Sequence, residues 1–139
     1  AYDEFMAGDD VVYLSEHRGS WGEDWGETSL HRSNPDSVLF PISITRDAAL
    51  KAAMARHSAC YPIWRIRPLS VSPAALDALR RCGRGIVIDD AHTPFAKAVA
   101  HDLASLTGAR MTVLGLEDRT AGFYRDNLPP TVEKIMEAI

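Results

Sequence analysis

Residues 85–92 read Gly85-Ile86-Val87-Ile88-Asp89-Asp90-Ala91-His92. A short unbroken apolar run, bounded by glycine on one side and by polar residues on the other, is typical of a β-strand buried on both faces. Such strands belong to parallel sheets that helices cover on both sides. This stretch therefore predicts the central strand of an α/β domain.

Helices are expected on both sides of that strand. Before it, Ser72 can cap a helix that begins with Pro73 and ends at Gly83. After it, Thr93-Pro94 repeats the same device and Gly108 closes the helix. The apolar stripe of the first helix comprises Leu76, Leu79 and Cys82, and that of the second comprises Phe95, Val99, Leu103 and Leu106.

The rest of residues 38–139 continues this alternation. Strands are expected at 38–44, 62–67 and 111–116, and helices at 47–58 and after Thr131. Pro41 lacks an N–H, which favours an edge position or a bulge in the first of these strands. Strands that alternate with single helices imply right-handed crossovers. We therefore expect a three-layer α/β fold with a mostly parallel sheet and helices on both faces.

Composition limits the possible partners. The chain has 139 residues and a net charge of −4, from 15 basic and 19 acidic side chains, which argues against a dedicated nucleic-acid binder. Its apolar runs fall short of the roughly 18–20 residues of a membrane span, and residues 1–10 are acidic, unlike a signal peptide. Two cysteines, Cys60 and Cys82, are too few for a disulfide scaffold. We expect a cytoplasmic protein without a nucleic-acid or membrane partner.

Residues 1–37 lack the regular alternation. They contain one short apolar run at 11–14, followed by Glu16 and His17 and then by the Gly19–Ser37 loop. Glu16 and His17 are candidates for a ligand or subunit contact, with a polar strand end as the simpler interpretation. Trp21 and Trp25 lie in a polar stretch of that loop, where indole rings are costly to leave in water. We expect them to pack against a partner or against the rest of the protein.

Asp89, Asp90 and His92 form the clearest chemical cluster, because ligands bind beyond the carboxyl ends of strands in open parallel sheets. Two carboxylates and an imidazole can bind a divalent metal or share a proton. In the alternative interpretation, Asp90 and His92 satisfy backbone groups at a strand-to-helix turn and Asp89 faces water.

Other familiar site motifs are missing. The sequence has neither Gly-x-Gly-x-x-Gly nor a lysine-containing phosphate loop, and Gly83-Arg84-Gly85 precedes its strand, which is the wrong end for phosphate. No Gly-x-Ser-x-Gly elbow is present. His57, Cys60 and Cys82 lack the paired spacings of a zinc site, and His101 is expected to be solvated.

Three motifs taken in order resemble a known family. They are Arg67-Pro68-Leu69-Ser70 before a proline-capped helix, Gly85–His92 before the next helix, and Asn127-Leu128-Pro129-Pro130-Thr131-Val132-Glu133-Lys134-Ile135. Together they resemble the C-terminal domain of thiamine-diphosphate enzymes of the transketolase superfamily, and within it the beta subunit of the 2-oxo acid dehydrogenase first component of the pyruvate or acetoin type. The resemblance covers about residues 38–139, and Asp10–Arg18 resembles the last strand of a preceding pyrimidine-binding domain.

The resemblance implies an assembly role. In such enzymes, other domains hold thiamine diphosphate and magnesium, and this chain has no Gly-Asp-Gly motif. We therefore expect no catalytic, cofactor-binding or metal-ligating residue in this chain alone. The expected partners are a second copy in a homodimer, an alpha-type subunit, or both. The sequence differs from relatives at Asp90, where they usually have Glu, and at 93–95, where they are rich in glycine.

Two rival hypotheses remain beside the assembly domain. The chain is a small stand-alone enzyme or ligand-binding module that uses the Asp89-Asp90-Ala91-His92 turn, or it is an interaction module that binds through Trp21 and Trp25.

Overall fold

The computed structural model describes residues 7–8, 29–116 and 129–139. Its main sheet has four parallel strands in the order β2-β1-β5-β6. These strands are β1 (Val38–Pro41), β2 (Ala59–Cys60), β5 (Arg84–His92) and β6 (Arg110–Leu116). The expected parallel sheet is thereby confirmed, with β1 and β5 as its two inner strands.

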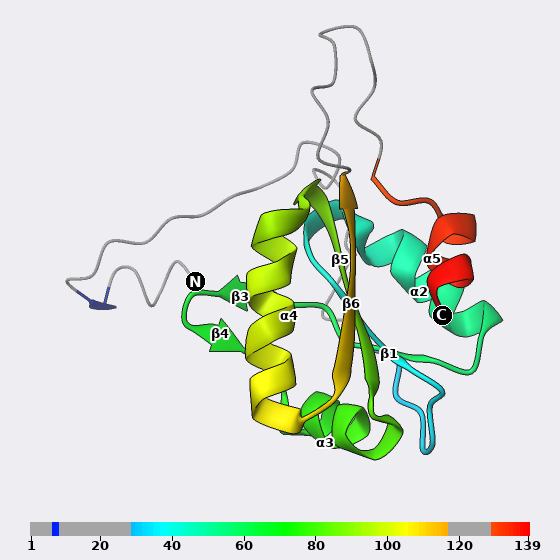
Figure 1. The fold of residues 1–139 in the computed structure, drawn as a ribbon, viewed down its shortest axis with the longest axis horizontal. Helices are drawn as coiled ribbons and strands as arrows, with labels where there is room; N and C mark the ends of the chain where they lie inside the picture. The colour runs from blue at the N-terminus through cyan, green and yellow to red at the C-terminus, as the bar shows by residue number, and fades with distance from the viewer. Residues whose placement is uncertain (1–6, 9–28, 117–128) are drawn as a thin grey trace, which may run out of the picture.

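Helices cover both faces of this sheet (Figure 1). One face carries α3 (Pro73–Cys82) and α4 (Thr93–Thr107), and the other carries α2 (Arg46–Ala55) and α5 (Val132–Ala138). A short 3-10 helix, η2 (Ser43–Thr45), follows β1, and β3 (Arg65–Ile66) pairs with β4 (Leu69–Ser70) as a small antiparallel ribbon. The three-layer α/β prediction is confirmed.

Alternate residues of the inner strands build two separate cores. Phe40 and Val87 pack with α3 and α4, whereas Leu39, Ile86 and Ile88 pack with α2 and α5. All five side chains are fully buried. This alternation is the period-two pattern of a strand, and it explains why the apolar runs of β1 and β5 are unbroken: each strand has a core on both sides.

Local capping sets both ends of α3 and the start of α5, whereas the helix expected at 47–58 spans Arg46–Ala55 and has no side-chain cap. The Ser72 hydroxyl accepts a hydrogen bond from the Ala75 N–H at 3.2 Å, and Gly83 ends α3 with a φ of +69°. Thr131 caps α5 by accepting from the Lys134 N–H at 3.4 Å. Gly108 follows α4 with a φ of +73°, which any residue with a Cβ adopts only at a cost.

The strand expected at 62–67 was misplaced. The sheet uses Ala59 and Cys60, which are buried, while Arg65 is exposed and belongs to the β3–β4 ribbon. A strand at 62–67 would bury charged side chains beside an apolar core, which is costly without a partner. Ile63 of that stretch adjoins the main sheet, through an isolated parallel bridge to Ile42 and a hydrogen bond to the Pro41 carbonyl.

Pro41 lies in an inner strand, so the expected edge position was wrong. The first strand also ends at Pro41 and not at residue 44, because η2 begins at Ser43. The Pro41 carbonyl accepts from the Ile63 N–H at 2.9 Å, so the missing N–H faces the β2 side. β2 has already ended at Cys60, and the proline therefore removes no bond from that ladder.

The face of α4 that packs against the sheet differs from the predicted apolar stripe. Val99 and Leu103 are buried as expected, but Phe95 is 44% exposed and Leu106 is 55% exposed. Ala96 and Ala100 take their place against the sheet. Small side chains at these two positions let the helix lie close to the strands, which turns the two larger residues outward.

Residues 30–37 run along the β2 edge of the sheet. Leu30 and Cys60 exchange two backbone hydrogen bonds of 2.8 and 3.0 Å, and the Asp36 N–H donates to the His57 carbonyl. The buried hydroxyls of Ser37 and Ser58 lie 3.0 Å apart. Within the part of the chain that the structure describes, none of the helices combines the length and apolar character that a membrane crossing requires.

Candidate functional site

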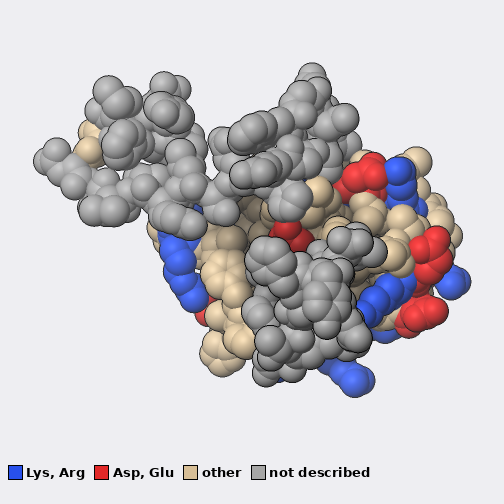
Figure 2. Space-filling view, turned by 90° about the horizontal axis from the view of Figure 1, so that it is seen from above, with Lys and Arg blue, Asp and Glu red and all other residues tan. Residues whose placement is uncertain are grey.

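The carboxyl ends of β1 and β5 lie together at one end of the sheet. Figure 2 looks down on this end and shows acidic atoms near its middle. Asp89 and Asp90 occupy the last part of β5. The structure thus places these two candidates where open α/β sheets bind their ligands.

Asp89 is a buried residue within the strand and not a solvated one. It is 2% exposed, and its Oδ1 accepts a hydrogen bond from the Asp90 N–H at 2.9 Å. The expectation that Asp89 faces water was therefore wrong. One carboxylate oxygen of Asp89 thus accepts a hydrogen bond from the backbone. The alternative interpretation of the sequence had assigned such backbone hydrogen bonds to Asp90 and His92.

β5 also continues further than expected. The turn predicted at residues 89–92 is strand, because β5 extends to His92 and α4 begins at the next residue. The register with β6 shifts between Ile88 and His92, and His92 pairs with Leu116. Such irregularities re-aim side chains and are over-represented beside functional sites. The position of the His92 side chain lies outside what the structure describes.

Thr45 joins the ends of the two inner strands. Its hydroxyl is buried and donates toward the carbonyl oxygens of Ile42, at 2.7 Å, and of Ile88, at 3.0 Å. The Ile42 N–H donates to the same Ile88 carbonyl at 2.8 Å. Sequence reasoning missed this residue; the signal was a threonine placed shortly after an apolar strand.

Arg46 and Trp64 form a stacked pair beside this end of β1. The Arg46 guanidinium carbon lies 3.9 Å from the centre of the Trp64 ring, and its Nε donates to the Ser43 carbonyl at 3.2 Å. Ser43 itself has a φ of +56°, which is uncommon for a residue other than glycine. Burial lowers the pKa of Arg46 from its ordinary value. Trp64 is 56% exposed, so its indole ring remains partly open to solvent while it stacks on Arg46.

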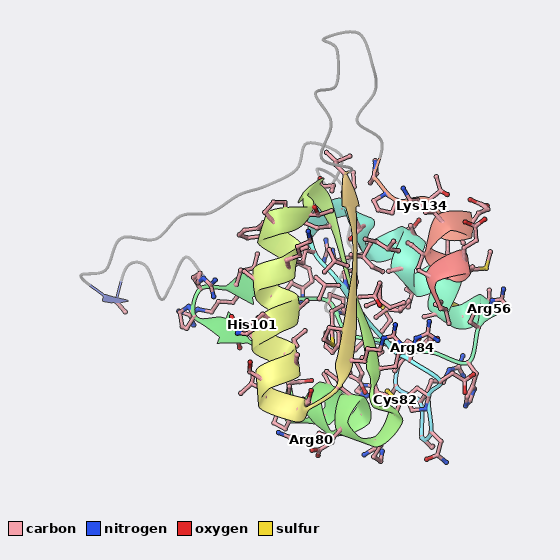
Figure 3. All side chains as sticks on the ribbon, in the orientation of Figure 1. Arg56, Arg80, Cys82, Arg84, His101 and Lys134 are labelled. Carbon is pink, nitrogen blue, oxygen red and sulfur yellow. The ribbon has the colours of Figure 1, made fainter. Side chains whose placement is uncertain are left out.

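Among the residues whose side chains the structure describes, no three His, Cys, Asp or Glu side chains lie close enough together to hold an ion. Burial raises the pKa of Cys60 to about 12, so its thiol is a poor metal ligand. Figure 3 shows Cys82 and Arg84 toward the opposite end of the sheet, and His101 on α4, where it is exposed. The solvated position expected for His101 is confirmed.

Four other candidates lie outside the described residues. They are Glu16, His17, Trp21 and Trp25, and most of the Gly19–Ser37 loop lies outside as well.

The described residues form an α/β domain whose fold has a counterpart among solved structures. A search of solved structures finds a chain described as a split-gene transketolase, inactive beta4 tetramer, with a TM-score of 0.63 and 15% sequence identity. The match covers 78% of this chain and 38% of that chain, so the protein spans less than half the length of this relative. No protein family matches the sequence, and no curated protein matches it either. The similarity shows the fold that the three sequence motifs predicted.

Proposed function

We propose that this chain is the C-terminal assembly domain of a thiamine-diphosphate-dependent enzyme, and that it is inactive by itself. The observation that carries the proposal is the shared fold together with its extent: the chain covers 38% of a transketolase chain, which corresponds to one part of a larger enzyme. The finer assignment, to a beta-type subunit of a 2-oxo acid dehydrogenase, rests on the sequence motifs at 67–70, 85–92 and 127–135.

The proposal places thiamine diphosphate and magnesium in neighbouring polypeptide. It rests here on the sequence, which has no Gly-Asp-Gly motif of the kind that the family resemblance associates with the diphosphate and the metal. The proposal gives the chain the role of pairing subunits and of shaping the approach to an active site that neighbouring polypeptide supplies. The structural relative is described as a tetramer, which is consistent with such a role.

Isothermal titration calorimetry tests the proposal directly. Thiamine diphosphate with Mg²⁺ is titrated into the purified chain, with a complete transketolase as positive control, and we expect binding heat only for the control. Light scattering on the same sample is expected to give the mass of a dimer. Tight cofactor binding by this chain alone, or turnover of a 2-oxo acid by it, would overturn the proposal.

A further inference from the structure

The two edges of the main sheet are unequal. β2 has only two residues, and Leu30 already pairs with its Cys60. β6 has seven residues, and among the described residues β5 is its only strand neighbour. Figure 1 looks onto this second edge: β6 lies in front of β5, with α4 on one side and α5 on the other.

One hydrogen bond shows which backbone groups of β6 face β5 and which face the open edge. The Arg110 N–H donates to the Gly83 carbonyl at 2.9 Å, so Arg110 directs its polar groups toward β5. Because successive residues of a strand direct these groups to opposite sides, Thr112 and Leu114 also face β5. The N–H and C=O groups of Met111, Val113 and Gly115 therefore point to the open edge.

This edge lacks the features that keep sheets apart. Proteins protect exposed edges with charged residues, prolines, short strands or bulges. Residues 111–116 are Met-Thr-Val-Leu-Gly-Leu, without a charge or a proline, and β6 pairs regularly from Arg110 to Leu114. Such an edge readily accepts another strand.

We propose that β6 pairs antiparallel with β6 of a second copy, around a two-fold axis at Val113; this interface deepens the proposed function and rests on its assembly role. Val113 then faces its own counterpart, and Met111 faces Gly115 of the second copy. Each of these pairs exchanges two N–H···O bonds. The two sheets become one continuous sheet across both copies.

The charges and side-chain sizes along β6 favour a second copy of the chain as the partner that pairs with its open edge. In this register Arg110, the only charged residue of β6, lies opposite Leu116 and far from its own counterpart. Like charges are therefore not opposed, which is a requirement for self-pairing. Met111, which is bulky, meets a glycine. An interface formed from the same patch on both copies is the usual arrangement of a homodimer.

Disulfide trapping tests the register. In a chain carrying Cys82→Ser, with Cys60 buried, Val113→Cys places two thiols on directly opposed residues whose Cα atoms lie about 5.5 Å apart. That distance falls within the range of about 4.4–6.8 Å that disulfides bridge. The matched control is Thr112→Cys, whose counterpart lies diagonally at about 7–8 Å. We expect a cross-linked dimer from Val113→Cys and none from Thr112→Cys. Equal cross-linking of both variants, or of neither, overturns the proposed register.

Hydrogen exchange of the unaltered chain supplies a test that needs no variant. We expect the amides of Val113 and Gly115 to be protected at high protein concentration and to exchange rapidly on dilution, while Thr112 and Leu114 stay protected throughout. Rapid exchange of the first two amides in a sample that is dimeric by light scattering overturns this interface and leaves the assembly role intact. Protection that persists in a diluted sample that light scattering shows to be monomeric means that residues of the same chain fill the edge, and it also overturns the inference.

Discussion

Cys60 shows how burial affects a single ionisable group. It lies in β2 within the core formed with α2 and α5, is 1% exposed, and burial raises its pKa from 9.0 to about 12. Above pH 9 the thiol of the unfolded chain loses its proton, whereas the folded chain keeps it. The unfolded state then binds fewer protons, so the free energy of unfolding must fall as the pH rises.

We therefore predict that stability declines between pH 9 and pH 12, by at most about 1.4 kcal/mol per pH unit from this residue. Urea unfolding at a series of pH values measures the slope. Cys60→Ala should flatten it. Burial also raises the pKa of Tyr61, which accounts for a residual slope above pH 10 in Cys60→Ala. An identical slope in the chain and in Cys60→Ala would contradict the assignment.

The residues that the sequence placed correctly are those whose role is local. Ser72, Gly83 and Thr131 act within a few residues of their own position, so capping rules were enough to find them. Thr45 and the Arg46–Trp64 pair depend on which segments the fold brings together. Ile88 and Trp64, the distant partners of Thr45 and Arg46, cannot be identified from the residues next to them in sequence, even though a threonine shortly after an apolar strand is a local signal. Asp89 was correctly placed at the sheet end, but its burial depends on neighbouring elements.

At the scale of elements, α4 shows why a sequence stripe can be misread. Phe95 and Leu106 match helical spacing as well as Ala96 and Ala100 do, and the larger side chains were given more weight. The helix instead lies close to the strands through its alanines. Strand placement failed for a related reason. The strand beside β1 is formed by Ala59 and Cys60, whose small side chains fit one into each core. Residues 62–67 resemble a strand more closely by composition, and the sequence prediction followed that composition.

A matched pair of substitutions on α4 tests its orientation. Leu103→Ala removes a fully buried side chain and should lower the free energy of unfolding by about 2–5 kcal/mol. Leu106→Ala changes the same atoms at a position that is 55% exposed and should stay within about 0.5 kcal/mol of the unaltered chain. Both values come from urea denaturation. A larger loss for Leu106→Ala than for Leu103→Ala would restore the stripe predicted from the sequence.

At the scale of the whole molecule, the sequence predicted the architecture better than the strand positions. Gly85–His92 and its two capped helices already imply a sheet with helices on both faces, because a strand apolar on both sides needs two cores. The order β2-β1-β5-β6 and the two unequal edges are properties of the assembled sheet. They follow from which strands pair, and that depends on contacts between distant segments.

Two separate cores should respond independently to small changes. Ile63 belongs to the core with α3 and α4, Ile86 belongs to the core with α2 and α5, and both are buried. Each Ile→Val substitution removes one methylene-sized group and should cost about 0.5–1.5 kcal/mol. Because the sheet separates the two sites, the double variant should equal the sum of the single variants within about 0.5 kcal/mol. Urea unfolding of the unaltered chain, the two single variants and the double variant measures the coupling energy. The comparison is the pair Ile86→Val and Ile88→Val, which belong to one core and are expected to show coupling. A coupling energy above about 1 kcal/mol between Ile63 and Ile86 would mean that the two faces of the sheet do not pack as separate cores.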